Sequence, residues 1–291
     1  MKNSQTYYYR KMSDPNLGID ILLAETFNRG RKFNTHWHEN MQLYFFTEGE
    51  AIVECSTNQY NVTTDSIIVI NNNELHSLES LSDNLKFYII SIDSSFLFSN
   101  QVDLCQTKFL SPLSQNQISF QNSIDNDRQI LECINKIIQE YLSREMGYEL
   151  AVKSAIYQLI VLLLRNYISK FLTKKELVSK VNNLKRFNII FKYIDNNYHI
   201  KISTQELANI LNTSTYHFCR MFKETTGKTP TDYINGIRVD KSVDYLNKGQ
   251  LNITEIALKC GFDSINYFSR LFKKHYNVSP TKFQKMNSKY L

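Results

Sequence analysis

Side chains suited to binding DNA recur at matched positions in two segments near the C-terminus of this 291-residue chain. Arg220 and Lys223 in the first segment correspond to Arg270 and Lys273 in the second, an offset of 50 residues in both cases (270 − 220 and 273 − 223). An Arg side chain can donate two hydrogen bonds to a guanine in the major groove, whereas a Lys side chain suits a phosphate. A single exposed Arg or Lys is usually a solvated charge, so it is the repetition that favours DNA binding.

Both segments carry the start and stop signals of a helix–turn–helix unit. A capping box, Ser203 with Glu206 and Asn252 with Glu255, opens the first short helix of each unit. The second helix then ends at a residue that tolerates a left-handed backbone, and a capping residue followed by proline starts a further helix. These later signals are Gly227 with Thr229-Pro230 in the first copy and Asn277 with Ser279-Pro280 in the second.

These signals predict an all-α domain of seven helices over residues 184–291. The two helix–turn–helix units span 203–226 and 252–276, and the second turn is one residue longer than the first. We expect a continuous helix over 231–246 to join the units and a helix over 186–196 to precede them. The second helix of each unit is the one expected to enter the DNA groove.

A helical wheel separates an inward and an outward face on these two recognition helices. The inward apolar residues are Phe218, Met221 and Phe222 in the first helix, and Phe268, Leu271 and Phe272 in the second. The candidates for base contact on or beside the outward faces are Tyr216, His217, Cys219, Arg220, Asn266, Tyr267 and Arg270. The candidates for phosphate contact are Lys223, Lys273 and Lys274. Arg suits guanine, Asn suits adenine, and an aromatic ring can contact the thymine methyl group.

Charge is distributed unevenly along the chain, whose net charge is +6. Residues 184–291 contain 17 Lys and Arg against 8 Asp and Glu, a net charge of +9. Residues 1–183 contain 17 against 20, a net charge of −3. A basic C-terminal part joined to a mildly acidic N-terminal part is expected when only one domain meets nucleic acid.

Residues 184–291 resemble the DNA-binding domain of the AraC/XylS family of bacterial transcription regulators. The resemblance lies in Gly261-Phe-Asp-Ser264, Tyr267-Phe-Ser-Arg270, Phe272-Lys-Lys274 and Ser279-Pro280. It implies that each recognition helix enters a major groove of promoter DNA, and it adds Ile265 to the base-contacting candidates. It also implies activation through contact with RNA polymerase and a small-molecule effector, with sugars the commonest class. Cys219 stands where relatives often have a longer polar residue.

The N-terminal part reads as a cupin-like β-barrel over residues 1–123, followed by helices. Short β-branched and aromatic segments between turn residues predict strands at 19–26, 42–47, 51–56, 59–62, 66–70 and 86–92. Two apolar stripes at helical spacing follow within 124–172, one from Ile130 to Leu142 and one from Ala151 to Tyr167. These helices can cover the barrel, and the second is apolar enough to pair two subunits as a homodimer. The polar stretch 173–183 is predicted to be a linker. The whole is an α+β chain of two domains.

Three histidines in the barrel have the spacing of the cupin motifs. His36-Trp37-His38 with Gln42 matches the first motif except that Gln42 stands where glutamate is usual, and His76 falls in a degraded second motif. The pattern resembles the cupin-type sensor domain of many AraC/XylS regulators. We expect these five residues to line an effector pocket, and because Gln42 is a weak neutral ligand we expect no metal and no other cofactor.

The remaining features favour a reduced, cytoplasmic protein. The five cysteines are scattered without zinc or disulfide spacing, the N-terminus lacks a signal sequence, and the longest apolar run, 159–164, is far too short for a membrane span. The chain is therefore expected to be a DNA-binding regulator and not an enzyme. Two alternatives stay open: a metal-dependent cupin enzyme with an attached helical domain, and a regulator that needs no ligand and has a vestigial barrel.

Overall fold

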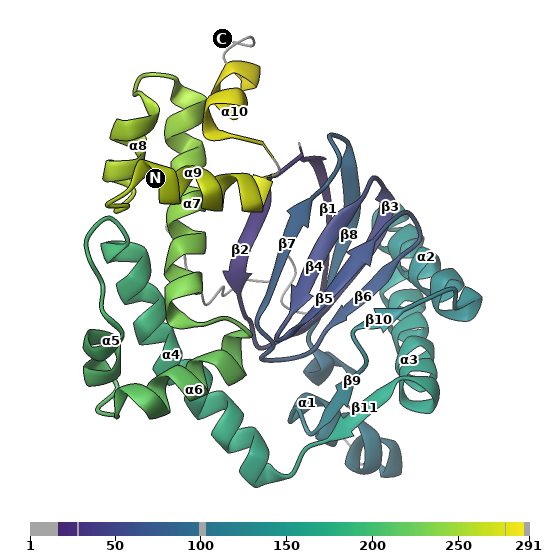
Figure 1. Ribbon diagram of the computed structural model, residues 1–291. Coiled ribbons are helices and arrows are strands. Elements are labelled where there is room, and N and C mark those ends of the chain that lie inside the picture. Colours follow the sequence, from purple (N-terminus) through teal and green to yellow (C-terminus); the bar gives the residue numbers. More distant parts are fainter. Residues whose placement is uncertain (1–16, 28, 99–102, 277, 288–291) are drawn as a thin grey trace. The chain divides into compact units, whose positions relative to one another are not determined.

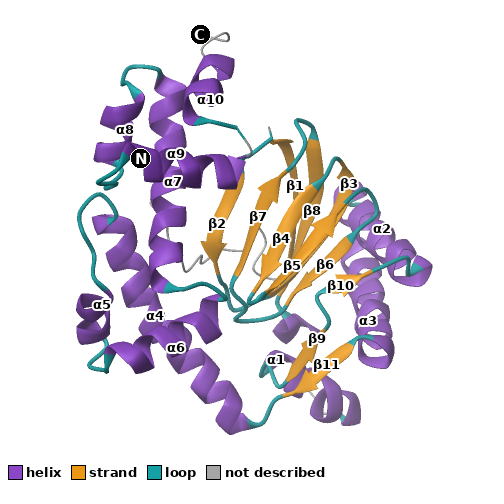
Figure 2. Cartoon of the chain, viewed as in Figure 1, coloured by secondary structure: helices purple, strands orange, loops and turns teal. Residues whose placement is uncertain are grey.

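The computed structural model describes residues 17–27, 29–98, 103–276 and 278–287. These residues form two compact units, one ending at Leu184 and the other beginning at Lys185. The first unit contains all of the described strands, and the second is helical (Figure 1; Figure 2). The predicted α+β class, with a sheet-rich N-terminal part and an all-α C-terminal part, is confirmed.

Two antiparallel sheets form the core of the first unit, with strand orders β1-β8-β3-β6-β10 and β2-β7-β4-β5. Their bounds are β1 Ile19–Phe27, β2 Lys32–His36, β3 Met41–Glu48, β4 Ala51–Cys55, β5 Asn58–Val62, β6 Ile67–Ile70, β7 His76–Ser80, β8 Leu85–Ile92 and β10 Ser123–Ile124. Strands β1, β3, β4, β5, β6 and β8 correspond to the six predicted segments. Strands β2 and β7 were not predicted, and they pair with each other so that His36 lies opposite His76.

Strand β3 is buried on both faces, which explains its continuous apolar run. Successive side chains of a strand point to opposite faces of the sheet. Tyr44 and Phe46 therefore lie on the face toward the smaller sheet, in one apolar cluster with Val53 of β4. Leu43 and Phe45 belong to a second cluster on the other face, which the helices of this unit cover.

Helices α2 (Arg128–Ser143) and α3 (Tyr148–Asn166) pack beside the larger sheet (Figure 1). Their predicted stripes supply buried residues to the cluster on that face, among them Ile134 and Leu159, so the predicted covering role is confirmed. Leu142 is an exception, because it is 60% exposed. Burial of amphipathic faces against a sheet is what stabilises helices of this length.

The segment between the sheets and the helices contains several short elements. They are a 3₁₀ turn η1 (Ser94–Leu97), a π-helical turn η2 (Gln106–Leu110), α1 (Ser111–Ser114), and strands β9 (Ile118–Phe120) and β11 (Ile168–Phe171). β9 and β11 pair antiparallel to each other. The segment predicted to be helical through residue 172 therefore ends as a strand, because Ile168–Phe171 finds a backbone partner in β9.

Helix α4 (Lys174–Asn197) runs through the stretch predicted to be a linker, so the expectations of a linker at 173–183 and of a helix starting at Arg186 are corrected. A capping box starts the helix at its N-terminus. The Thr173 amide donates to Glu176 Oε2 at 2.8 Å, and the Glu176 amide donates to Thr173 Oγ1 at 3.3 Å. Such a box supplies hydrogen-bond partners to the first amides of a helix, which lack partners within it.

The second unit continues with α5 (Thr204–Ile210), α6 (Thr215–Thr226), α7 (Pro230–Lys248), α8 (Ile253–Lys259), α9 (Ile265–Tyr276) and α10 (Pro280–Asn287). Together with α4 this gives seven helices within the described residues, as predicted. Helix α7 is the predicted connecting helix. It begins one residue earlier and ends two residues later than the predicted range of 231–246. The turn between α8 and α9 is one residue longer than the turn between α5 and α6, also as predicted.

Candidate nucleic-acid interface and sensor site

The helix caps predicted from the sequence hold both helix–turn–helix units in place. Ser203 caps α5 and Asn252 caps α8, and in each case the predicted glutamate completes the capping box. Gly227 ends α6 with a left-handed φ of 73°, and Thr229 caps α7 ahead of its proline. Asn277, predicted to end the second recognition helix, lies outside the described residues.

The inward faces of α6 and α9 are the predicted ones. Phe218 and Phe222 of α6 are fully buried, and so are Phe268 and Phe272 of α9. The α6 pair contacts the rings of Phe187, Phe191 and Tyr233 from the neighbouring helices α4 and α7. The α9 pair contacts the rings of Phe262, Tyr276 and Phe283. Each recognition helix is therefore held by an aromatic cluster along its inner stripe.

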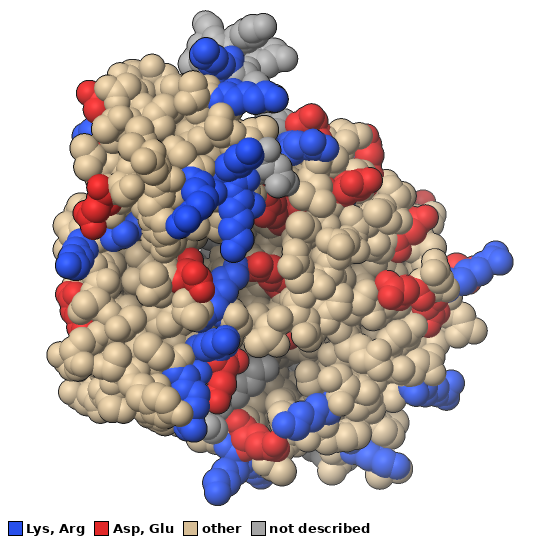
Figure 3. All heavy atoms as spheres, viewed as in Figure 1, with Lys and Arg blue, Asp and Glu red and all other residues tan. Residues whose placement is uncertain are grey.

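The opposite faces of the two helices lie open to solvent. The exposed candidates are Tyr216, His217, Arg220 and Lys223 on α6, and Ile265, Asn266, Tyr267, Arg270, Lys273 and Lys274 on α9. Tyr216 is 80% exposed, whereas Cys219 is only half-buried and lies at the margin. Figure 3 shows several Lys and Arg side chains, with some Asp and Glu among them, on the visible face of the helical unit.

The two arginines at matched positions have different surroundings. On α6, Arg220 Nε lies 3.8 Å from Glu224 Oε1, one helical turn further along, and both side chains are exposed. On α9, the residue that corresponds to Glu224 is Lys274. Arg270 lies with its guanidinium carbon 5.3 Å from the centroid of the Tyr267 ring. Aromatic stacking restricts the motion of an exposed Arg without neutralising its charge.

Two residues to which the sequence interpretation gave no role connect the first helix–turn–helix unit to the second. Arg238 of α7 donates from Nε to the carbonyl of Tyr198 at 2.8 Å and from Nη2 to the carbonyl of Ile200 at 2.7 Å. Gly261, in the turn before α9, has a φ of +82°, and a Cβ there would meet the Tyr198 carbonyl oxygen at 2.5 Å. The segment that follows α4 thus contacts the turn of the second helix–turn–helix unit, at a position where only glycine fits. The quoted family motif begins at this glycine, and that was the available signal.

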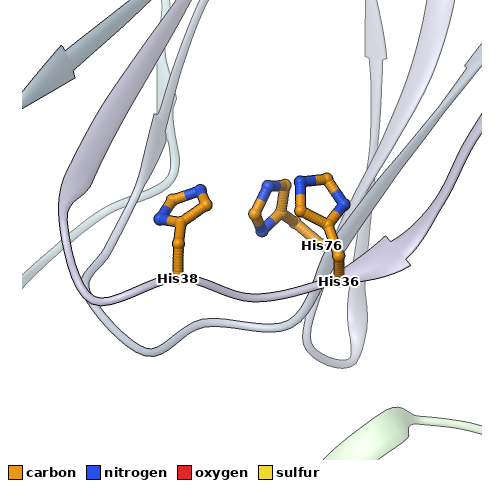
Figure 4. A group of neighbouring side chains, drawn as sticks. All are labelled: His36, His38 and His76. Atoms are coloured by element: carbon orange, nitrogen blue, oxygen red, sulfur yellow. The ribbon is translucent and has the colours of Figure 1, made fainter. Parts of the chain in front are cut away.

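A second candidate site lies in the first unit, where three imidazoles meet (Figure 4). His36 ends β2, His38 follows two residues later, and His76 begins β7. The ring centroids lie 4.1 Å apart for His36 and His76, 4.8 Å for His38 and His76, and 5.9 Å for His36 and His38. One nitrogen from each ring lies within 4.8 Å of the others. The structure thus brings together all three predicted histidines.

Burial keeps two of these imidazoles neutral. Burial, and then the neighbouring His36, lower the pKa of His38 to about 4. Burial, with His36 and His38 beside it, holds the pKa of His76 well below its usual value of 6.5. Both effects disfavour the charged ring, since an imidazolium here would lose hydration and face a like charge.

The other two pocket candidates differ in their relation to the histidines. Gln42 is buried on β3 and donates from Nε2 to Ser91 Oγ at 2.9 Å, and its side chain beside His38 opposes a small part of the lowering of the His38 pKa. Trp37 is also buried. Alternation along an extended segment places Trp37 on the side opposite to His36 and His38. Gln42 thus joins the cluster, and Trp37 supports the segment from the other side.

A buried carboxylate that the sequence interpretation missed holds the loop before His76. Glu74 Oε2 accepts hydrogen bonds from the Asn71 amide at 2.9 Å, from Asn71 Nδ2 at 3.1 Å and from Asn122 Nδ2 at 2.8 Å. The Glu74 carbonyl accepts from His76 Nδ1 at 2.9 Å. Glu74 therefore fixes the orientation of the His76 ring through its own backbone.

Comparison with known proteins gives matches in both units. A model described as an AraC-like ligand binding domain matches residues 18–160, and a helix-turn-helix domain model matches residues 207–286. The uncharacterized HTH-type transcriptional regulator YdeC of Bacillus subtilis (strain 168) is 24% identical over 258 residues, which are 87% of this chain and 86% of that protein. The HTH-type transcriptional activator RhaS of Escherichia coli is 23% identical over 252 residues, 85% of this chain and 86% of that protein.

The two family models together cover the sheet unit, its helices and both helix–turn–helix units. The chain belongs to the AraC family of transcription regulators. Among solved structures, ToxT from Vibrio cholerae O395, bound to (E)-4-(8-methylnaphthalen-1-yl)but-3-enoic acid, matches 93% of this chain and 99% of that chain, with a TM-score of 0.43 and 20% identity.

As an AraC-family regulator, the chain combines a ligand-binding domain with a helix–turn–helix DNA-binding domain. The predicted family and the predicted class of function are confirmed at this level. Within the described residues, no helix is both long enough and apolar enough to span a membrane.

Proposed function

We propose that this regulator activates transcription by binding promoter DNA as a homodimer, in response to a small-molecule effector. The observation that carries the proposal is the matched outward display of Arg220 and Lys223 on α6 and of Arg270 and Lys273 on α9. Capped neighbouring helices and buried phenylalanines fix both recognition helices. The exposed Arg and Lys side chains therefore project from a rigid surface. A rigid basic helix of this kind fits the major groove.

The two recognition helices occupy successive major grooves on one face of the DNA, about 34 Å apart. Base contact is made by Tyr216, His217, Cys219, Arg220, Ile265, Asn266, Tyr267 and Arg270. Phosphate contact is made by Lys223, Lys273 and Lys274. The exposure of all but Cys219 supports these roles. The net charge of +9 over residues 184–291 supports binding to a polyanion.

The sheet unit senses an effector and performs no reaction. The relatives named above, which match most of this chain, are transcription regulators, and that supports a sensor over an enzyme. We place the effector beside His36, His38, Gln42 and His76, and not beside Trp37, which lies on the other side of the segment, and we propose a small polar metabolite such as a sugar. An effector changes DNA binding only if its affinity differs between two states of the protein.

Activation and dimerisation have separate support. RhaS is named a transcriptional activator, and activation in this chain would act through contact with RNA polymerase bound to DNA in the cytoplasm. Leu150, Tyr157 and Val161 form a stripe of exposed apolar residues along α3, although the Tyr157 hydroxyl donates to the Leu97 carbonyl of the same unit. Apolar residues at this spacing suit a partner helix, and a second copy of the chain is the proposed partner.

Selection of bound sequences from a random duplex library tests the proposal. The full chain should enrich one element, and fluorescence anisotropy should show tighter binding to it than to a scrambled duplex at the same salt concentration. Arg270→Ala should weaken binding to the enriched element by about 1–3 kcal/mol more than it weakens binding to the scrambled duplex. Arg128→Ala is the matched control, because Arg128 is also an exposed arginine on a helix, here α2. A folded chain that enriches no sequence would refute specific DNA binding.

A further inference from the structure

The three-histidine cluster has a geometry that neither the family assignment nor the proposed DNA binding requires. His36 and His76 face each other across the β2–β7 pair, and His38 extends from the same side of the chain as His36 (Figure 4). The rings come from two segments about forty residues apart in the sequence, held by backbone pairing. One nitrogen from each ring lies within 4.8 Å of the others.

Hydrogen bonds fix the tautomers of two of the rings. His38 Nδ1 lies 2.7 Å from the Asn40 carbonyl, and His76 Nδ1 lies 2.9 Å from the Glu74 carbonyl. A carbonyl only accepts, so each Nδ1 carries the hydrogen and each Nε2 of a neutral ring presents a lone pair. Neither Nε2 has a well-oriented hydrogen-bond partner among the described residues, although His38 is 6% exposed and His76 1% exposed.

Buried lone pairs of this kind need something that accepts electron density. A single hydroxyl of a ligand donates one hydrogen and so satisfies one nitrogen. A metal ion accepts both of these lone pairs at once and can also bind the neighbouring His36 ring, and an Nδ1–H that donates to a backbone carbonyl is the usual second contact of a metal-bound histidine. We propose that His36, His38 and His76 bind one divalent transition-metal ion, with Nε2 as the ligand atom of His38 and His76.

Ligand chemistry narrows the ion to the zinc, cobalt, nickel, copper and iron group, since imidazole suits these and not magnesium or calcium. Tetrahedral bonds of ~2.0–2.1 Å place ligand atoms ~3.3 Å apart, so the rings must close slightly around the ion. Gln42 donates from Nε2 to Ser91, which leaves its Oε1 to approach the ion as a weak fourth ligand. The proposal departs from the expectation of no metal drawn from Gln42, because the structure brings one nitrogen from each of three imidazoles within 4.8 Å of the others.

Metal titration of the full chain tests the site directly. Chain freed of metal and of any histidine tag should take up one Co²⁺ per chain, with the visible absorption of nitrogen-bound cobalt, and Zn²⁺ should displace it. His76→Asn and His36→Asn should each weaken binding at least ~100-fold, a loss larger than that from removing an outer contact. Because His36 is only half-buried, His36→Asn should fold even if the change at the fully buried His76 prevents folding, and the test then rests on His36→Asn. His199→Asn, at an exposed position, is the control and should bind like the parent.

A gain of affinity provides the second arm. Gln42→Glu places a charged carboxylate beside the three imidazoles, and it should tighten Co²⁺ binding ~10-fold or more because the ligand set then offsets part of the ion's charge. Gln59→Glu makes the same change at an exposed position of β5 and should have no effect. Failure of the folded parent to bind Co²⁺ or Zn²⁺, or equal uptake by a His36/His38/His76 triple variant, would overturn the proposal. Neither outcome bears on DNA binding, which is measured separately on the operator.

Discussion

Tyr267 links Arg270 to the connecting helix. Its ring lies under the guanidinium of Arg270 at 5.3 Å, and its hydroxyl accepts a hydrogen bond from Asn235 Nδ2 of α7 at 3.0 Å. On α6 the matched arginine instead faces Glu224. Helix α9 therefore presents an arginine that lies against an aromatic ring and has no ion pair with a described residue, whereas α6 presents one beside an acidic neighbour. The two recognition helices, alike in fold, should contribute unequally to DNA binding.

Loss of the supported arginine should reduce both affinity and selectivity. We expect Arg270→Ala to weaken binding to the selected operator by about 1–3 kcal/mol and to relax preference at one base pair, since a bidentate contact to guanine has about that worth. Arg270→Lys keeps the positive charge but loses the bidentate donor. Compared with Arg270→Ala, it should therefore restore part of the affinity for DNA in general but not the preference for the base pair that Arg270 contacts. Anisotropy titrations on operators altered at single base pairs measure both. Equal losses on operator and random DNA would leave Arg270 a phosphate contact only.

Reversal of the charge at Glu224 should make α6 resemble α9. We expect Glu224→Lys, which supplies the counterpart of Lys274, to tighten binding to all duplexes and to steepen the dependence of log K on log salt by about 0.9 for each new phosphate contact. Glu132→Lys makes the same change on the exposed face of α2 and serves as the control. If the two variants raise affinity equally, the effect reflects overall charge and α6 does not lie against the phosphates.

The sequence predicted the helical unit closely because its signals are local. Capping residues, a left-handed glycine and aromatic spacing each act within a few residues, and those that fall on described residues of α5, α6 and α8 were found where expected. The start of α4 was missed for a different reason. The polar composition of 173–183 suggested a linker, but Thr173 and Glu176 form a capping box of the same type as Ser203 with Glu206. A local signal was present there and composition was given more weight.

The sheet unit shows what local signals leave undetermined. Strand β2 lacks a clear alternation of polar and apolar residues, and it becomes a strand through its pairing with β7, which is distant in sequence. His36 and His38 share a side because they are two residues apart in an extended segment, whereas the approach of His76 depends on that pairing. The role of Glu74 depends on Asn122, 48 residues away, which no short pattern could indicate.

Truncation of the inner phenylalanine of α9 should unfold the helical unit selectively. Phe268→Ala should lower the free energy of unfolding by about 3–5 kcal/mol, because a fully buried ring leaves a cavity. Tyr216→Ala removes an exposed ring and should change stability by less than about 0.5 kcal/mol. The single tryptophan, Trp37, lies in the sheet unit, so its fluorescence reports that unit alone, while circular dichroism reports α4 to α10 together with α2 and α3 of the sheet unit. A parallel shift of both signals in Phe268→Ala would mean that the units unfold together.

Three glycines of the helical unit separate backbone strain from steric conflict. Gly261→Ala should cost more than the ~1–2 kcal/mol of a left-handed alanine, because its Cβ would also meet the Tyr198 carbonyl at 2.5 Å. Gly249→Ala has a φ of +64° but meets no described atom within 4 Å, so it should show the strain alone. Gly236→Ala, inside α7, should stabilise by about 0.5–1 kcal/mol. Equal effects at Gly261 and Gly249 would mean that the contact between Tyr198 and this turn is absent in solution.

The helical unit should fold and bind DNA without the sheet unit, provided that α4 is kept whole. The boundary between the units, Leu184 to Lys185, falls inside α4. A fragment of residues 173–291 keeps the Thr173–Glu176 capping box, whereas a fragment of 185–291 removes the first turns of the helix. We expect the longer fragment to be the more stable, by thermal melting followed with circular dichroism.

The same fragment tests whether the sheet unit and its helices pair two copies of the chain. Without the stripe of Leu150, Tyr157 and Val161, fragment 173–291 should bind the operator ~10²–10⁴-fold more weakly than the full chain, because the second subunit is no longer tethered. Its salt dependence should also be shallower, since fewer phosphates are neutralised per complex.

Leu150→Glu in the full chain should reproduce the loss of affinity without removing any DNA contact, and sedimentation should show this variant as a monomer. If the fragment and the full chain bind with equal affinity and equal salt slope, α3 does not pair the subunits. If the folded fragment binds no DNA, the assignment of the DNA-binding surface to α6 and α9 is wrong.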